Sequence, residues 1–337
     1  MEAYLYESLE ENKVKCNLCN HGCVIKEGRR GICGVRENRG GVLNTLVYGK
    51  LIARHIDPIE KKPLFHLMPG SLSYSIATVG CNFKCKFCQN ADIAQMPSDR
   101  NGIIMGDPCS PKDIIDAALK GDCRTIAYTY TEPTVFFEFA YDTAKLAHQK
   151  GIKNVFVTNG YMSAQALNMI SPYLDAANVD LKAYTNDFYK TYCEAKLAPV
   201  KETLKLMKSL GVFVEVTTLL IPGLNDARDE LEELAAFVAD SLGAETPWHI
   251  SRFHPTYKLM DRPSTPVKTL VMAREIGIKA GLKYVYTGNV PGENGEKTFC
   301  YQCGKILIDR WGFYVRKNLI ENGQCSYCGA HIHGVEM

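Results

Sequence analysis

The sequence lacks the features that mark membrane-spanning, secreted and nucleotide-driven proteins. No apolar run approaches the ~20 residues needed to span a bilayer, and the start, MEAYLYESLEENK, has no apolar signal-peptide segment. The chain contains no P-loop, no glycine-rich dinucleotide fingerprint and no repeat at a fixed period. The net charge is only +2, so the overall basic charge of proteins that wrap nucleic acid is missing. These absences predict a cytoplasmic protein with no membrane partner.

Basic residues are concentrated in one short stretch between residues 26 and 39. The stretch holds five basic residues against two acidic ones, Glu27 and Glu37. The basic residues are Lys26, Arg29, Arg30, Arg36 and Arg39. We interpret the stretch as a solvated loop around a metal site, and a docking surface for RNA or an acidic protein is the alternative.

Cysteine is the most informative residue, because 14 are present. A reducing cytosol disfavours disulfides, so we predict that most of these cysteines are metal ligands. They form three groups, with four cysteines at 16–33, three at 81–88 and four at 300–328. The remaining three, Cys109, Cys123 and Cys193, are predicted to be buried small apolar side chains.

The C-terminal group has zinc-ribbon spacing. Cys300 and Cys303 form one pair, Cys325 and Cys328 form another, 21 residues separate the pairs, and a glycine follows each. This pattern predicts structural zinc. A second iron site is the alternative, because four thiolates do not by themselves decide between iron and zinc.

The N-terminal group has less regular spacing. Cys16, Cys19, Cys23 and Cys33 are accompanied by His21, which is a fifth candidate ligand. We predict structural zinc or an auxiliary iron–sulfur cluster here. Neither this segment nor the C-terminal one is apolar enough to make its own core, so a bound metal has to supply folding energy.

Between these groups, short β-rich runs alternate with amphipathic helical stretches, which is typical of a parallel sheet built from βα units. The predicted strands are 72–80, 125–131, 154–159, 177–183, 212–222, 248–254 and 283–288. The predicted helices are 113–121, 135–150, 164–170, 200–210, 226–241 and 267–280. The fold class is therefore α/β, a partial (β/α)6 TIM-like barrel over 51–290 with small cysteine modules at 1–50 and 291–337. In such barrels chemistry occurs at the carboxyl ends of the strands.

The strongest chemical signal is the segment GCNFKCKFCQN at 80–90, directly after the first predicted strand. Cys81, Cys85 and Cys88 can bind one iron–sulfur cube and leave its fourth iron without a protein ligand. A structural metal site normally closes its coordination with a fourth residue, so three cysteines favour a catalytic cluster that accepts an external ligand. The alternative is a zinc knuckle that borrows a distant ligand.

A cysteine loop of this form after a first strand resembles the radical S-adenosylmethionine (SAM) superfamily, and within it the activating enzymes of pyruvate formate-lyase. Residues 59–66, the 80–90 loop and the flanking cysteine module also resemble the radical SAM component of the AmmeMemoRadiSam system. The resemblance implies a [4Fe-4S] cluster whose open iron binds SAM. It also implies a reduced flavodoxin or ferredoxin as electron donor.

The resemblance further implies which residues contact SAM. They are Phe87 and Asn90 in the cysteine loop, Tyr130, Thr131 and Glu132 after the second strand, Thr158 and Asn159 after the third, Asp180 and Lys182 after the fourth, Pro222 after the fifth and His254 after the sixth. The chain departs from the family pattern at 130–131, where glycines are absent, and at Val157, where activating enzymes carry Asp. For Glu132 the alternative is a helix cap, for Asp180 and Lys182 a structural ion pair, and for His254 a structural contact.

We therefore expect a radical SAM enzyme that cleaves SAM reductively and acts on a macromolecule or on a molecule delivered by a partner. The candidate subclasses are a glycyl-radical-enzyme activase, an enzyme that modifies RNA or protein, and an enzyme that cleaves SAM at another bond for 3-amino-3-carboxypropyl transfer. AmmeMemoRadiSam proteins are the corresponding partners. The alternative from another class is a non-catalytic, metal-dependent protein that binds nucleic acid.

Overall fold

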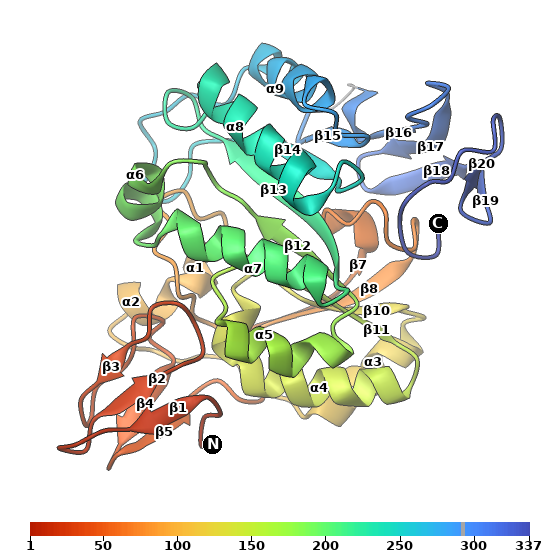
Figure 1. Cartoon of the computed structure of the whole chain (residues 1–337). Coiled ribbons are helices and arrows are strands. Elements are labelled where there is room, and N and C mark those ends of the chain that lie inside the picture. The colour runs from red at the N-terminus through yellow and green to blue at the C-terminus, as the bar shows by residue number, and fades with distance from the viewer. Residues whose placement is uncertain (291–293) are drawn as a thin grey trace.

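The computed structural model describes residues 1–290 and 294–337, and an eight-stranded sheet forms its centre (Figure 1). From one edge to the other, the strands are β15 (Val285–Gly288), β14 (Trp248–Arg252), β13 (Phe213–Leu220), β12 (Ala176–Asp180), β11 (Lys153–Thr158), β10 (Thr125–Tyr128), β8 (Leu72–Ala77) and β7 (Ala53–Pro58). Strands β8 and β10 to β15 run parallel, and β7 pairs antiparallel with β8. All seven predicted strands are present, and the predicted partial barrel is confirmed.

Helices follow the parallel strands and cover the outer face of the sheet (Figure 1). The longer helices are α3 (Pro111–Lys120), α4 (Phe137–Gln149), α5 (Ala164–Ile170), α7 (Leu197–Ser209), α8 (Arg228–Phe237) and α9 (Val267–Lys279). The six predicted helices are all found. The one predicted over 226–241 divides into α8 and a π-helical turn over Val238–Leu242. No helix in the described part of the chain is long and apolar enough to cross a membrane.

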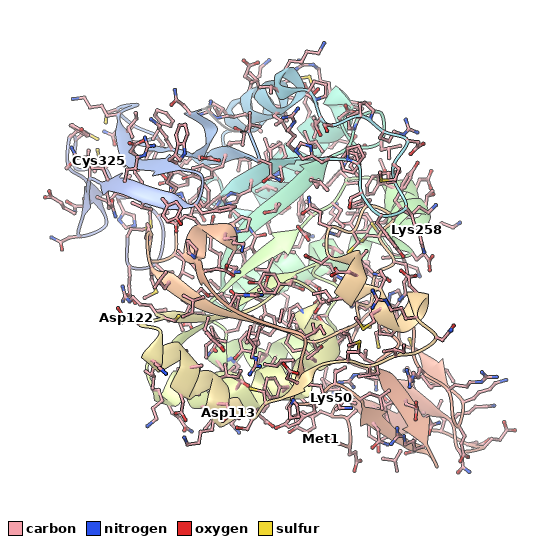
Figure 2. The ribbon with its side chains drawn as sticks, turned by 180° about the vertical axis from the view of Figure 1, so that it is seen from behind. Met1, Lys50, Asp113, Asp122, Lys258 and Cys325 are labelled. Carbon is pink, nitrogen blue, oxygen red and sulfur yellow. The ribbon has the colours of Figure 1, made fainter. Side chains whose placement is uncertain are left out.

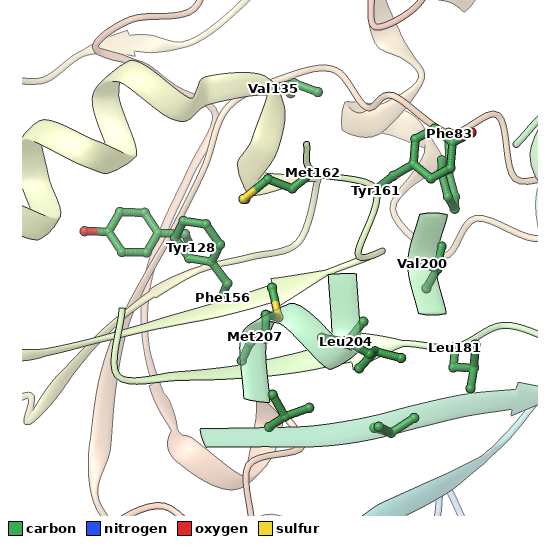
Figure 3. Close-up of a cluster of buried hydrophobic side chains, with 14 of the residues drawn as sticks. Phe83, Tyr128, Val135, Phe156, Tyr161, Met162, Leu181, Val200, Leu204 and Met207 are labelled. Carbon is green, nitrogen blue, oxygen red and sulfur yellow. The ribbon is translucent and has the colours of Figure 1, made fainter. Parts of the chain in front are cut away.

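The main core lies between the sheet and these helices (Figure 3). In α7, Val200, Leu204 and Met207 are fully buried, and their spacing of four and three places them on one helix face. Tyr128 of β10 and Phe156 of β11 meet edge to face with ring centroids 5.3 Å apart. This packing fixes the strand ends from which the site is built.

The N-terminal module, residues 1–50, is a small β structure that shares the core of the barrel. Its strands are β1 (Tyr6–Ser8), β2 (Val14–Cys16), β3 (Val24–Ile25), β4 (Arg36–Arg39) and β5 (Val42–Thr45), and β6 (Lys50–Leu51) pairs with β9 (Asp107–Pro108) beyond it. Val14, Leu18 and Val35 belong to the same buried cluster as the barrel side chains. The apolar side chains of the module therefore pack into the same core as those of the barrel.

This module contacts the carboxyl ends of two strands. The Asn20 amide donates to the Tyr161 carbonyl (3.0 Å), and the Ser163 amide donates to the Leu18 carbonyl (3.0 Å), both just beyond β11. At the end of β8, Gly80 has φ +100°, and a β-carbon there would lie 2.5 Å from Val35 Cγ1. Only glycine permits so close an approach.

The C-terminal module packs on the β15 side of the sheet. Its strands are β16 (Thr298–Phe299), β17 (Ile306–Trp311), β18 (Tyr314–Asn318), β19 (Ile320–Glu321) and β20 (Gln324–Cys325). A separate buried cluster joins the module to Phe65, Tyr284 and Tyr286. Figure 2 shows Met1 and Cys325 far apart on opposite sides of the barrel. The predicted boundary at 290/291 falls at 291–293, outside the described residues.

Candidate functional site

Two adjoining cavities open at the carboxyl ends of the strands. The inner cavity measures about 400 Å³, and the outer cavity measures about 820 Å³. Twelve of the fourteen predicted cluster and SAM residues line the inner cavity. They are Cys81, Cys85, Phe87, Cys88, Asn90, Tyr130, Thr131, Glu132, Thr158, Asn159, Asp180 and Lys182. Pro63, Gln89, Thr217, Ser251, Asn289 and Phe313 line both cavities, so the two are continuous.

The cysteine loop is held in place by the backbone of a neighbouring loop. The Lys84 amide donates to the Cys193 carbonyl (2.9 Å), and the Lys86 amide donates to the Tyr192 carbonyl (2.9 Å). Burial raises the pKa of Cys88 to about 11, so a bound metal is needed to keep this thiol ionised near neutral pH. Cys123 and Cys193 are buried as predicted, but Cys109 is partly exposed because it follows β9 near the surface.

Cys193 has a position that the sequence did not reveal. Its buried thiol lies against the Cys85 sulfur, in addition to the backbone contact with Lys84. Cys193 therefore packs against the cysteine loop. More than a hundred residues separate it from that loop along the chain, so the contact could not be predicted from the sequence.

Glu132 is a fully buried carboxylate that joins two strand ends. Its Oε1 accepts from the Thr134 amide (3.0 Å) and the Thr158 hydroxyl (2.8 Å), and its Oε2 accepts from the Asn159 amide (2.8 Å). Glu132 thus caps the 3-10 turn over Pro133–Phe136, which is the alternative considered from the sequence. Because Oε2 has one partner, it keeps acceptor capacity toward the cavity.

Tyr130 adopts a backbone conformation that is more usual for glycine. Its φ is +61°, a left-handed conformation that is uncommon for a bulky residue. Its carbonyl accepts from Asn90 Nδ2 (2.8 Å), and its hydroxyl donates to Asp57.

Two residues beside Tyr130 were not predicted as site residues. Lys62 is 1% exposed, lines the inner cavity and donates to Asp57 Oδ2 (2.6 Å). Burial lowers the pKa of Lys62 to about 8, against the opposing effect of Asp57. Asp57 lies in β7, an antiparallel strand that the sequence analysis did not predict. The sequence segment Glu60-Lys61-Lys62-Pro63 was the available signal.

Asp180 and Lys182 form an ion pair at the end of β12. Lys182 Nζ lies 2.9 Å from Asp180 Oδ2 and 5.8 Å from the centre of the Phe87 ring. Burial alone would lower the pKa of Lys182, but Asp180 and the Cys85 sulfur raise it well above its usual value. Lys182 is therefore a permanent cation next to the cysteine loop.

Two buried polar atoms at the inner cavity have no partner among the described residues. They are Asn178 Oδ1 in β12 and Thr217 Oγ1 in β13. Asn178 is 1% exposed and Thr217 is 8% exposed. Buried polar atoms are normally hydrogen-bonded, so this pair indicates that a polar ligand completes the cavity.

The last two predicted SAM residues lie elsewhere. His254 lines the outer cavity, where its Nδ1 lies 2.9 Å from Ser264 Oγ. Pro222 is absent from the described residues that line either cavity, and Leu219 lines the inner cavity instead. The outer cavity is bounded by Trp311 and Phe313, which are 56% and 44% exposed in the hairpin of the C-terminal module.

The C-terminal cysteines are already gathered into one group. The sulfurs of Cys300, Cys303, Cys325 and Cys328 all lie within 4.8 Å of one another. Cys300 and Cys328 are 3.7 Å apart, and Cys303 and Cys325 are 3.8 Å apart. The glycines that follow each pair have φ values of +71° and +74°, as tight turns require.

The N-terminal cysteines are arranged differently. Cys16, Cys19, Cys23 and Cys33 all line one cavity of about 20 Å³, and His21 lines it too. Within the described residues, only the C-terminal cysteines meet the 4.8 Å limit, so the N-terminal sulfurs are more widely spaced. The His21 side chain is already engaged, because its Nε2 lies 2.8 Å from the Asn82 carbonyl oxygen.

Comparisons with known proteins identify a family. The family model described as "Radical SAM superfamily" matches residues 75–238. "Uncharacterized protein MJ0808" from Methanocaldococcus jannaschii is 50% identical over 333 residues, which is 98% of each chain. The pyruvate formate-lyase-activating enzyme of Clostridium pasteurianum is 23% identical over 198 residues, covering 54% of this chain and 80% of that protein.

A similar fold occurs in solved structures. A radical SAM methyltransferase from Sphaerobacter thermophilus matches with a TM-score of 0.52 and 15% identity, covering 66% of this chain and 68% of that one. At this identity the likeness shows the fold alone.

Proposed function

The chain belongs to the radical SAM superfamily and is a radical SAM enzyme, and from this premise we propose that it cleaves SAM reductively at a [4Fe-4S] cluster on Cys81, Cys85 and Cys88. The observation that carries the proposal is the inner cavity, which brings three cysteine sulfurs together with a ring of polar strand ends. A closed structural site would not adjoin a cavity of this size.

The residues present fit both cofactors. Three thiols from one loop suit a cluster with an open iron, and the unpartnered atoms of Asn178 and Thr217 suit a polar ligand beside it. When bound, the cluster and SAM supply a 5′-deoxyadenosyl radical. We propose that Lys182 binds the SAM carboxylate, and that Glu132 and the carbonyl of Thr131 accept from its ammonium group.

The outer cavity is the proposed entry for the substrate. It is about twice the volume of the inner cavity and continuous with it, and exposed aromatic side chains stand at its rim. Exposed aromatic residues are favoured where another molecule binds. We propose a macromolecular or partner-delivered substrate, which includes a protein, an RNA or an AmmeMemoRadiSam partner. The electron donor is a reduced flavodoxin or ferredoxin, and the C-terminal cysteines bind zinc.

A glycyl-radical activase is the second candidate. The relatives named as activating enzymes favour it, including "Putative glycyl-radical enzyme activating enzyme MJ1632" from M. jannaschii at 25% identity over 209 residues. A non-catalytic protein that binds nucleic acid does not agree with the superfamily match and is set aside.

Product analysis of anaerobically reconstituted protein tests the proposal. With SAM and a reductant, wild-type protein is expected to form 5′-deoxyadenosine, and Cys85→Ala is expected to form none. Cys109→Ala is the matched control, because this cysteine lies outside all three groups and should retain activity. Methylthioadenosine as product would instead support 3-amino-3-carboxypropyl transfer. Turnover retained by Cys85→Ala would refute the cluster assignment.

A further inference from the structure

We infer that the N-terminal cysteines, Cys16, Cys19, Cys23 and Cys33, bind a second iron–sulfur cluster and not zinc. This metal assignment stands without the proposed function, although the placement of the second cluster beside the first rests on it. Three observations carry the inference, namely the spacing of the sulfurs, the polar atoms around them and the contacts that join this site to Cys81.

The spacing argument uses the chain's own zinc-like site as a reference. Zinc–sulfur bonds of about 2.3 Å in a tetrahedron place the sulfurs about 3.8 Å apart. The C-terminal sulfurs match this value, at 3.7 and 3.8 Å. The N-terminal sulfurs line a cavity of about 20 Å³, which must widen by movement of the cysteine side chains to hold a cubane, and they do not approach one another within 4.8 Å as a group. A cubane needs such wider spacing, because each thiolate binds a different iron.

The polar surroundings provide a second argument. Arg36 and Asn82 line the N-terminal cavity, and each is 1% exposed. Arg36 Nε, Arg36 Nη1 and Asn82 Nδ2 are buried donors with no partner in the described structure. Buried N–H groups need acceptors. The sulfides and thiolates of an anionic cluster are such acceptors, and N–H groups next to cluster sulfurs are a recognised means of setting the reduction potential.

The C-terminal site again provides the contrast. Arg310 is the buried arginine of the C-terminal module, and Nη1 of this residue donates to Thr298 Oγ1 (2.7 Å) while Nη2 donates to the Phe65 carbonyl (2.8 Å). None of the Arg310 nitrogens is left unpartnered. All side-chain nitrogens of Arg310 therefore bond to structural partners, whereas two side-chain nitrogens of Arg36 have no partner among the described residues beside the cysteines.

Contacts through Asn82 join the N-terminal site to the catalytic loop. Asn82 follows Cys81 directly, and its Oδ1 accepts from Asn159 Nδ2 (2.8 Å) at the inner cavity. Its carbonyl oxygen lies 2.8 Å from His21 Nε2. A β-carbon on Gly80 would lie 3.2 Å from the Cys33 carbonyl oxygen. Asn82 thus follows a cysteine of the 80–90 loop and also lines the N-terminal cavity, so we expect the two proposed clusters to be neighbours that interact magnetically when both are reduced.

Metal analysis of anaerobically reconstituted full-length protein tests the inference. Wild-type protein is expected to contain about eight irons and about one zinc, from two four-iron clusters and one tetrahedral site. Cys85→Ala leaves the N-terminal module intact and is expected to retain about four irons. Two zincs in wild-type protein, or no iron in Cys85→Ala, would overturn the inference.

The matched variant is the double substitution Cys16→Ala/Cys19→Ala. It is expected to lose about four irons while keeping a cluster whose spectrum responds to SAM. If instead the spectrum of the remaining iron does not respond to SAM, and Cys85→Ala retains its iron, the proposed function is refuted while the N-terminal cluster is supported. Electron paramagnetic resonance of fully reduced protein should show spin interaction in wild type that disappears in Cys85→Ala.

Arg36→Lys tests the polar argument. Lysine keeps a positive charge toward Glu138 but removes the two unpartnered guanidinium donors. In the Cys85→Ala background, we expect unchanged iron content and a more negative midpoint potential, because hydrogen bonds to cluster sulfurs favour the reduced state. An unchanged potential would show that Arg36 does not face a cluster.

Discussion

The two cysteine modules attach to the barrel in the same way but use their buried arginines differently. Arg36 pairs with Glu138 of α4, and Arg310 lies 3.5 Å from Glu60 in the turn after β7, with all four side chains at most 1% exposed. In the C-terminal module all side-chain nitrogens of the arginine have structural partners, and the cysteine sulfurs lie close together. In the N-terminal module two side-chain nitrogens of the arginine have no partner among the described residues, and the cysteine sulfurs lie farther apart. Cysteine counting alone does not distinguish such sites, whereas sulfur spacing and neighbouring donors do.

The largest expected effect is loss of the C-terminal metal. Cys325→Ser should abolish zinc binding and unfold residues 294–337, because structural zinc supplies on the order of 10 kcal/mol of folding free energy in small domains. Hydrogen exchange with mass spectrometry measures this. Cys16→Ser is the comparison, and there the module should keep much of its protection because its apolar side chains share the barrel core. Equal loss of protection from hydrogen exchange in both modules would contradict the proposed difference between them.

Next in size are the two anchoring ion pairs. Arg36→Met or Arg310→Met leaves a buried glutamate without its cation, which costs about 3–5 kcal/mol. We expect the larger loss for Arg310→Met, because it also removes the hydrogen bonds to Thr298 and Phe65. Denaturation midpoints of the two metal-loaded variants measure the difference. A larger loss of stability for Arg36→Met would mean that the unpartnered donors of Arg36 do have structural partners in the folded protein.

Acid should weaken the attachment of the C-terminal module through His66. His66 contacts the His333 carbonyl (2.6 Å), and burial lowers the pKa of His66 from 6.5 to about 4. Between these values the unfolded state binds the extra proton, so stability falls as pH drops from about 6.5 to about 4, by up to about 3 kcal/mol. His66→Gln should lack this part of the pH dependence. Identical pH profiles of unfolding for wild type and variant would contradict the assignment.

The smallest expected effect concerns exposed charges of the N-terminal module. Glu37 pairs with Arg30 (2.9 Å) and with Arg39 (2.7 Å), and Arg39 is 61% exposed. Glu37→Gln should change stability by no more than about 1 kcal/mol, because water screens such pairs. Thermal unfolding of the metal-loaded protein measures this. A loss comparable with that of Arg36→Met would show that the module depends on surface pairs and not on its buried one.

Most of the barrel and most of the inner cavity could be predicted from the sequence. The strands β8 and β10 to β15 are apolar runs separated by amphipathic helices, so their parallel direction followed from the pattern alone. Residues such as Glu132, Asn159 and Lys182 come together because parallel strands bring their carboxyl ends to one side. That convergence depends on topology and not on side-chain detail.

Site residues at the edge of the sheet and sulfur distances in the separate cysteine modules could not be predicted from the sequence. Strand β7 reads Ala-Arg-His-Ile-Asp-Pro, and its mostly exposed edge position leaves no apolar signal. Asp57 was therefore missed. Pro222 lies in the predicted loop, but the packing of neighbouring side chains determines which of them reach the cavity. The spacing of cysteines gives candidate ligands, but only the fold gives the distances between their sulfurs.

The close approach at Gly80 affects how this protein should be divided for experiments. The superfamily match begins at residue 75, which invites expression of the barrel without the first 50 residues. Such a fragment would remove Val35 and Cys33 from the backbone just ahead of Cys81 and would expose the apolar side chains beneath them. The cysteine loop at 80–90 and the N-terminal module are thus one inseparable unit, and truncation would damage the proposed cluster site from a distance in sequence.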